Sequence, residues 1–183
     1  RYVEISNWVV IAVGLFLFAL YLSNVAGRLD RLHLKVENAR NALDRQLALR
    51  SAICSDIAGL DLLDATLRSR LANAIHASIS EESLDIHTKN EWDIESEVTK
   101  SLCELFNKDF DITKYPNQKN LIQETAGATR RVQYALTFYN DAARSALKVR
   151  RRWLVRSFRL FGRASMPVLI DFDDQIPQGL EFC

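Results

Sequence analysis

An uncharged apolar stretch near the start of the chain constrains its fold more than any other feature. Residues 5–27 contain no Asp, Glu, Lys or Arg, and residues 8–22 are almost wholly apolar. An α-helix rises about 1.5 Å per residue, so roughly 20 apolar residues cross the ~30 Å hydrocarbon core of a bilayer. The stretch therefore predicts a transmembrane helix, with everything that follows it on one side of the membrane.

Two other interpretations of residues 5–27 stay open. A cleaved signal peptide would need a basic region ahead of the apolar stretch and a small-residue cleavage site, to which residues 24–26 are a poor match. A buried helix of a soluble core would show a polar face, which residues 8–22 lack. A membrane anchor fits the pattern best.

The charges that flank this stretch predict its orientation. Basic residues within about 15–20 positions of a span tend to keep their side of it in the cytoplasm. We therefore expect a single-pass protein of the cell membrane, with its N-terminus outside and its helical domain in the cytoplasm. One basic residue precedes the stretch and several follow it closely: Arg1, then Arg28, Arg31, Lys35 and Arg40.

The cysteines agree with a cytoplasmic domain. Cys54, Cys103 and Cys183 are odd in number and far apart, and the first two fall at apolar positions of predicted helices. Buried free thiols suit a reducing compartment, whereas small secreted domains pair their cysteines. No spacing of Cys and His residues suggests a metal site, and we expect no cofactor.

Scarce helix-breaking residues predict long helices. The 183 residues include three Pro and six Gly, and apolar residues recur at steps of three and four. The first helix is expected to run without a break through Gly27 to about Ile57, on a stripe close to the heptad of a coiled coil. Gly59 and Pro116 are expected to mark helix boundaries. The other expected helices cover residues 61–79, 91–107 and 118–161.

These helices predict an all-α fold, in which one N-terminal transmembrane helix continues into an antiparallel three- to four-helix bundle. The predicted parts are a transmembrane anchor at residues 1–27, a cytoplasmic helical bundle at residues 28–162 and an extended C-terminal tail at residues 163–183. The tail mixes apolar and acidic residues and is too short to form a core alone. It would either pack along the bundle or dock on a partner as an extended peptide.

Two blocks of opposite charge are the clearest functional signal after the apolar stretch. Residues 144–163 contain eight basic residues and no acidic one, with aromatic residues interleaved, whereas residues 81–111 are rich in acids. In an up-down bundle the fourth helix returns toward the membrane, where its basic end would meet anionic lipid headgroups. The residues predicted to make this contact are Arg150, Arg151, Arg152, Trp153, Arg156 and Arg159.

Two other interpretations of residues 144–163 also stay open. The block fits a solvated basic face beside an ordinary core stripe. The alternation of basic and aromatic residues also occurs in RNA-binding segments, although we expect no nucleic-acid partner. The expected partners are the lipid bilayer and other membrane proteins or further copies of this chain.

Several short motifs follow one another along the chain. They are Val36-Glu37-Asn38-Ala39, Leu43-Asp44, Gln46-Leu47 and Arg50, then Arg130-Arg131, Phe138-Tyr139-Asn140 and Ala142, and finally Leu160-Phe161-Gly162, Pro167 and Phe172. In this order they resemble the LemA family of small bacterial membrane proteins. The resemblance implies one N-terminal transmembrane helix with the N-terminus outside and an all-helical antiparallel domain. It implies no catalytic residues.

The expected function is that of a non-catalytic, membrane-anchored scaffold or interaction protein. The alternative is an accessory subunit of a larger bacterial membrane complex, such as a respiratory or transport assembly. An enzyme is not expected, because His33, His76 and His87 lie in no nucleophile or metal motif and no phosphate-binding glycine loop occurs.

Overall fold

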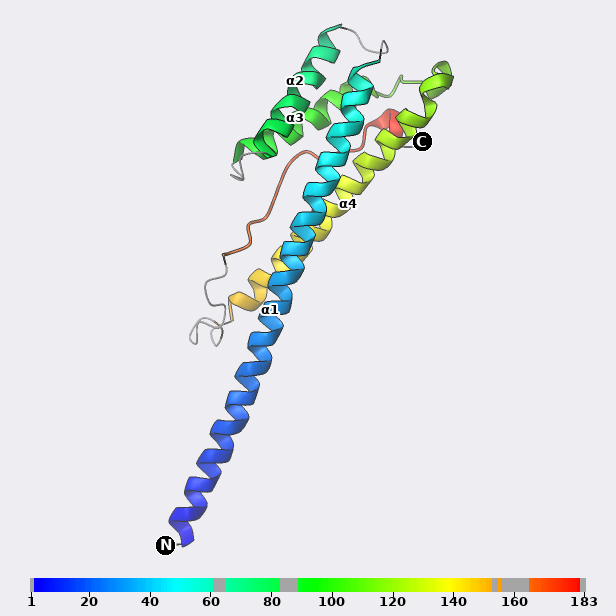
Figure 1. The fold of residues 1–183 in the computed structure, drawn as a ribbon. Helices are drawn as coiled ribbons and strands as arrows, with labels where there is room; N and C mark the ends of the chain where they lie inside the picture. Colours follow the sequence, from blue (N-terminus) through cyan, green and yellow to red (C-terminus); the bar gives the residue numbers. More distant parts are fainter. Residues whose placement is uncertain (1, 61–64, 83–88, 153–154, 156–164, 182–183) are drawn as a thin grey trace. The chain divides into compact units, whose positions relative to one another are not determined.

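The computed structural model describes residues 2–60, 65–82, 89–152, 155 and 165–181 (Figure 1). These residues form helices, turns and extended segments and contain no strand, which confirms the all-α prediction. The four α-helices are α1 (Tyr2–Ala58), α2 (Ala65–Glu82), α3 (Lys89–Leu105) and α4 (Lys119–Arg150), with 3-10 turns at Ile112–Lys114, Pro116–Gln118 and Gln178–Leu180.

Helix α1 runs unbroken through Gly27, as predicted, and ends where Gly59 follows it. The Gly59 N–H donates to the carbonyl oxygens of Ser55 and Asp56, both at 3.2 Å. Helices α2 and α3 lie close to their predicted ranges. The uncharged stretch and the first bundle helix are therefore one continuous element.

The prediction for the fourth helix was wrong at its end, because α4 stops at Arg150 instead of continuing to residue 161. Arg151 and Arg152 form a turn, in which their N–H groups donate to the carbonyl oxygens of Leu147 and Val149 at 3.1 Å. Val149 and Val155 belong to one buried cluster. In a continuous helix these two positions would point about 120° apart. The turn allows both side chains to be buried together.

The chain divides into two compact units. Unit 1 consists of Arg1–Asn38 and Asp141–Val168, and unit 2 consists of Ala39–Asn140 and Leu169–Cys183. Unit 1 therefore contains the apolar half of α1 and the basic end of α4. Unit 2 contains the rest of both helices together with α2 and α3.

In unit 2, α2 and α3 pack side by side in opposite directions (Figure 1). Arg70 near the start of α2 binds Glu104 near the end of α3 at 2.7 Å, whereas Ser78 near the end of α2 binds Glu95 near the start of α3. Exposed ion pairs contribute little stability. These two contacts nevertheless show that α2 and α3 run antiparallel, because each joins the start of one helix to the end of the other.

Contacts of α1 give its direction within unit 2. Arg40 lies over the ring of Trp92 at 4.8 Å, and Arg50 binds Glu95 farther along α3, so these two helices run parallel. Arg40 also lies beside Tyr139 of α4. Cys54 and Ile57 share a cluster with Ile122 and Ala126 at the start of α4, so α1 and α4 run antiparallel.

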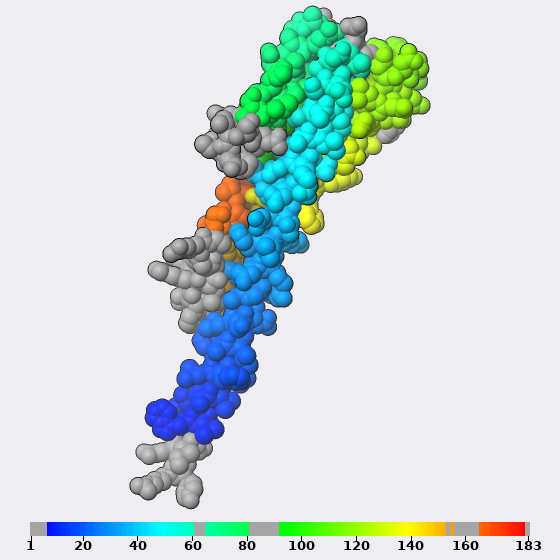
Figure 2. All heavy atoms as spheres, viewed as in Figure 1, coloured from blue at the N-terminus to red at the C-terminus, as the bar shows by residue number. Residues whose placement is uncertain are grey.

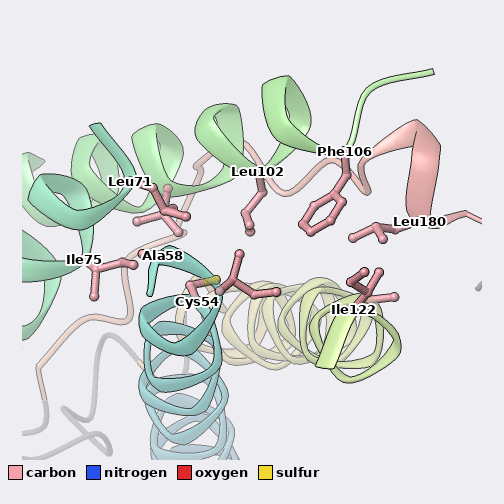
Figure 3. Packing of buried hydrophobic residues seen from close by; sticks show 11 residues of the cluster. Cys54, Ala58, Leu71, Ile75, Leu102, Phe106, Ile122 and Leu180 are labelled. Carbon is pink, nitrogen blue, oxygen red and sulfur yellow. The ribbon is translucent and has the colours of Figure 1, made fainter. Parts of the chain in front are cut away.

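The core of unit 2 draws on all four helices and on the C-terminal segment. Figure 3 shows Cys54, Leu71, Leu102 and Ile122 converging from α1, α2, α3 and α4. Leu180 enters the same cluster and is fully buried. Apart from Leu180, the members of this core lie within the helices predicted from apolar spacing or at the end of one of them. Leu180 belongs to the C-terminal tail, which the sequence allowed either to pack along the bundle or to dock on a partner.

Residues 169–181, here called the strap, lie along unit 2 and are bound mainly through their main chain. The Asn140 side chain donates to the Ile170 carbonyl at 2.8 Å and accepts from the Ile170 N–H at 3.0 Å. Arg130 donates to the carbonyls of Leu180 and Glu181. Further main-chain contacts join Asp173 N–H to Ser96 Oγ at 3.1 Å, Asp174 O to Gln133 Nε2 at 3.4 Å and Gly179 N–H to Phe106 O at 2.9 Å.

Apolar side chains of the strap add packing to these hydrogen bonds. Ile170 and Phe172 are buried, and the Phe172 ring stacks on Trp92 with centroids 5.7 Å apart. The strap thus joins α3 to α4. Of the two placements left open by the sequence, packing along the chain's own bundle is the one observed.

We expect Gly179→Ala to destabilise unit 2. An added Cβ would lie 2.6 Å from the Asn107 carbonyl oxygen and 2.9 Å from that of Phe106, so the strap or the end of α3 would have to move. Overpacking of this kind costs about 1–3 kcal/mol, or roughly 5–15 °C in the midpoint of thermal unfolding. Circular dichroism of the purified chain measures the shift.

The matched control is Gly127→Ala in the middle of α4. Its added Cβ would meet only the Arg131 side chain, at 3.6 Å. Replacing a mid-helix glycine by alanine stabilises a helix by up to about 1 kcal/mol. The two glycines should therefore shift the midpoint in opposite directions, and equal shifts would contradict the packing assigned to Gly179.

Candidate functional site

The apolar half of α1 leaves its side chains uncovered. An 18-residue window in this helix has a mean hydropathy of 2.3, and none of it is buried. Trp8 is 72% exposed and Phe16 64% exposed. Figure 2 shows this part of the chain in blue, with its side chains open along the helix. Among the helices that the structure describes, α1 is the one that is long and apolar enough to cross a membrane.

Such a surface favours an apolar environment. Removing apolar surface from water contributes about 25 cal/mol per Å². Contiguous apolar surfaces on soluble monomers rarely exceed a few hundred Å². The exposed large side chains between residues 8 and 21 are Trp8, Val9, Val10, Ile11, Val13, Leu15, Phe16, Leu17, Phe18, Leu20 and Tyr21.

The end of α4 packs beside α1 directly after the uncharged stretch. Val149 and Val155 are buried against Leu29, with Val25 and Leu32 around them. All five residues belong to unit 1. The basic residues that follow Val149 therefore lie beside the turns of α1 where apolar sequence gives way to charged sequence.

The structure describes three of the six residues predicted to contact lipid. Arg150 is the last residue of α4, and its Nη1 donates to the Ser165 carbonyl oxygen. This arginine therefore binds the main chain of the C-terminal segment. Arg151 and Arg152 lie in the turn and are exposed. The other predicted contacts lie outside the described residues: Trp153, Arg156 and Arg159.

A buried ion pair, which sequence reasoning missed, connects the helices of unit 2. Arg50 of α1 is fully buried, and its Nη2 lies 2.5 Å from Glu95 Oε2 on α3. Arg50 Nη1 also donates to Thr99 Oγ1 at 3.0 Å. Ser78 of α2 donates to the other carboxylate oxygen of Glu95. One carboxylate thereby joins three helices.

A signal for this pair was present in the helical spacing. Arg50 occupies an apolar stripe position between Leu47 and Cys54, and Glu95 lies between Trp92 and Val98 on the buried side of α3. Charged residues are almost never fully buried unless they are paired. Two opposite charges on the buried faces of two helices predict such a pair.

Burial also sets the chemistry of Cys54. Loss of solvation raises the pKa of its thiol to about 12, and the nearby Arg50 only partly offsets this effect. The thiolate is the nucleophilic form of cysteine. Cys54 therefore acts as a packed apolar side chain, as its place in the helical stripe predicted.

A second polar cluster lies around Arg40. Its Nε donates to Asp44 at 3.0 Å, and its guanidinium lies over Trp92, on which Phe172 of the strap stacks. Burial is the main cause that raises the pKa of the neighbouring Tyr139 phenol, while Arg40 lowers it. The cluster links α1, α3, α4 and the strap through one cation.

The described residues were compared with the requirements of a metal site, and one surface groove lies among them. No group of three His, Cys, Asp or Glu side chains within them is arranged to hold a metal ion. A shallow groove of about 410 Å³ lies between α2 and α3, and its floor and rim include Ala74, Ile94, Glu97 and Arg70. The groove is open to solvent, and its polar and apolar lining residues do not form a recognisable group of catalytic side chains.

Comparison with known proteins gives no match. No family model, curated protein or solved structure matches the chain. The resemblance to the LemA family therefore stays a prediction based on the motifs quoted above.

We expect Arg50→Met and Glu95→Leu to be strongly destabilising alone and much less so together. Removing one partner of a buried ion pair leaves an uncompensated charge, which costs about 3–5 kcal/mol, whereas an apolar pair of similar volume is often neutral. Denaturant unfolding of the full chain in detergent, followed by circular dichroism, measures the free energies of unfolding.

Arg70→Met provides the control for this prediction. Arg70 and Glu104 form an exposed pair, with both side chains 46% exposed. Such pairs contribute about 0–1 kcal/mol. A double variant of Arg50 and Glu95 as unstable as the sum of its single variants would contradict the coupling.

Proposed function

We propose that this chain is a non-catalytic, membrane-anchored helical scaffold or interaction protein of the LemA type. In this proposal α1 crosses the cell membrane once, with the N-terminus outside and unit 2 in the cytoplasm. The chain's partners are the bilayer and other membrane proteins or further copies of itself. No cofactor is required.

The observation that carries the proposal is the exposed apolar half of α1. Its uncharged stretch is long enough for a hydrocarbon core of ~30 Å, and its side chains are uncovered in unit 1. The same helix continues to Ala58. An anchor that is continuous with a bundle helix suits a protein that presents a folded unit beside the membrane.

The basic residues at the end of α4 support contact with anionic headgroups. Val149 packs on Leu29, which follows the uncharged stretch almost immediately. Arg151 and Arg152 are exposed there. A juxtamembrane Lys or Arg gains about 1 kcal/mol near an anionic surface. This contact would fix the end of α4 at the membrane surface.

Exposed aromatic residues on α4 favour the alternative of an accessory subunit. Tyr134 is 69% exposed and Phe138 is 56% exposed, one helical turn apart. Aromatic residues are enriched in protein interfaces relative to other surfaces. A partner subunit of a respiratory or transport assembly would cover this face, whereas a scaffold would use it for weaker contacts.

Labelling in intact cells tests the anchor and its orientation. A cysteine placed at His76, which is exposed on α2, should resist a membrane-impermeant maleimide until the cells are permeabilised. An epitope fused ahead of Arg1 should be accessible to external protease. Labelling of the His76→Cys variant in intact cells would refute the orientation, and recovery of the unfused chain in the soluble fraction would refute the anchor.

Purification in mild detergent through a tag separates the two functions. We expect this chain to be recovered alone or as a homo-oligomer if it is a scaffold. Stoichiometric recovery of the subunits of one enzyme or transporter would establish the accessory role. Tyr134→Ser/Phe138→Ser should then abolish that recovery, while Thr137→Ser on the same exposed stretch should leave it unchanged.

A further inference from the structure

We propose that the exposed face of α4 binds the same face of a second copy of this chain, with the two α4 helices antiparallel. The proposal names a surface for the self-association included in the proposed function, and it depends on α4 rather than on the anchor. The observation that carries it is a symmetric arrangement of charged and aromatic residues about position 136.

The face lies on one uninterrupted helix, Lys119–Arg150. Val132, Leu136 and Ala143 are buried on the opposite side of this helix. At 3.6 residues per turn, the residues of the exposed face fall within an arc of about 120°. All but Gly127 have exposed side chains. The face consists of Glu124, Gly127, Arg131, Tyr134, Phe138, Asp141, Ser145 and Lys148.

Positions at equal distances from residue 136 carry complementary charges. Arg131 and Asp141 are each five positions from it, and Glu124 and Lys148 are each twelve positions from it. When two helices pack antiparallel about a two-fold axis at this level, each residue faces its symmetric position on the second copy. The shallow crossing angle of about 20° found in helical bundles brings such positions opposite each other. Each opposite-charge pair would therefore form twice in the dimer.

The centre of the face carries the aromatic residues. Tyr134 is 69% exposed and Phe138 is 56% exposed, and each is two positions from residue 136. Phe138 also has a contact within its own chain, so its exposed part is the surface available to the second copy. Stacked or edge-to-face aromatic pairs stabilise an interface beyond the area that they bury. The small residues Gly127 and Ser145, each nine positions from residue 136, allow close approach on either side.

The same charges disfavour other arrangements. In a parallel pair Arg131 would face Arg131 and Asp141 would face Asp141, and like charges across an interface are repulsive. An unrelated partner would require no symmetry in this chain. Asp141 accepts from Arg144 on its own helix at 3.3 Å, but such exposed pairs contribute little and leave the carboxylate accessible. The pattern therefore selects an antiparallel second copy.

The pairing also sets the direction of the two copies of α1. Helices α1 and α4 run antiparallel in unit 2, and each is a single helix. A two-fold axis at right angles to α4 therefore points the two α1 helices in opposite directions. If α1 crosses a membrane as proposed, the two copies are anchored in facing bilayers, and their pairing holds these bilayers together.

Charge reversal in the full chain, purified in mild detergent, tests the pairing. Arg131→Glu alone or Asp141→Arg alone would place like charges opposite each other twice in every dimer. We expect either variant to raise the dissociation constant of the dimer at least about tenfold. Sedimentation equilibrium over a range of protein concentrations measures this constant, and circular dichroism checks that the helices remain folded.

The two changes together should restore the dimer. Arg131→Glu/Asp141→Arg again places opposite charges across the antiparallel interface, so the double variant should recover most of the lost affinity. Arg45→Glu, the same change of charge at an exposed position of α1, should leave the affinity unchanged. A double variant as weak as the single ones would overturn the proposed register.

Cross-linking reports the direction of the two helices. Cys103 and Cys183 are replaced by serine, and Cys54 is kept because its side chain is fully buried. Two differently tagged preparations carry Gly127→Cys and Ser145→Cys, and a short bis-maleimide is added to each alone and to their mixture. We expect cross-linked dimers that contain both tags in the mixture and few dimers in either preparation alone.

The outcomes separate this inference from the proposed anchor. A chain that sediments as a monomer throughout overturns the pairing and leaves the labelling test of α1 unaffected. Cross-linking of Gly127→Cys with itself overturns the antiparallel arrangement. Stoichiometric binding of a different protein that Tyr134→Ser/Phe138→Ser abolishes, in a chain that does not pair with itself, assigns the face to an accessory role instead.

Vesicles that expose unit 2 test the consequence for membranes. They should cluster in a turbidity assay, lose this clustering with Arg131→Glu and regain it with Arg131→Glu/Asp141→Arg. Clustering that is absent, or unchanged by Arg131→Glu, overturns the joining of facing bilayers.

Discussion

The carboxylate of Glu95 is the point on which the arrangement of unit 2 depends. It accepts hydrogen bonds from Arg50 of α1 and Ser78 of α2, and Thr99 on the same helix as Glu95 accepts a further bond from Arg50. Burying two charges is costly, and only good geometry with further hydrogen bonds offsets that cost. A shift of α1 along α3 by one turn would leave the guanidinium buried without its partner. We therefore infer that the Arg50–Glu95 ion pair specifies the register of α1 against α3.

The apolar contacts around this pair are less selective. Cys54, Leu71, Leu102 and Ile122 pack through dispersion and area burial, which tolerate exchange among residues of similar volume. Such a core favours helix association in general. The ion pair, the Arg40 cluster and the main-chain contacts of the strap restrict the association to one arrangement.

Much of the fold was readable in the sequence because helical periodicity is a local property. The apolar stripes predicted the four helices, and the scarcity of glycine and proline predicted the unbroken α1. The end of α4 could not be read in this way. The burial of Val149 and Val155 against Leu29 decides it, and that contact joins residues far apart in the chain. The strap was ambiguous for the same reason, because its hydrogen bonds go to helix side chains.

The candidate site divides in a similar way. The uncharged stretch and the basic residues Arg151 and Arg152 were evident as patterns of charge and hydropathy. The hydrogen bond from Arg150 to the Ser165 carbonyl oxygen could not be predicted, because it joins a helix side chain to the main chain of an irregular segment.

The strap has a consequence for the order of events during synthesis. Leu180 fills a place among side chains from α1, α2, α3 and α4. A growing chain that has already produced those four helices still has an opening in its core until residue 180 leaves the ribosome. Contacts between residues so distant in sequence form late and slow folding. During that interval the anchor proposed for α1 would already be able to enter a membrane, so unit 2 would be tethered before its core is complete.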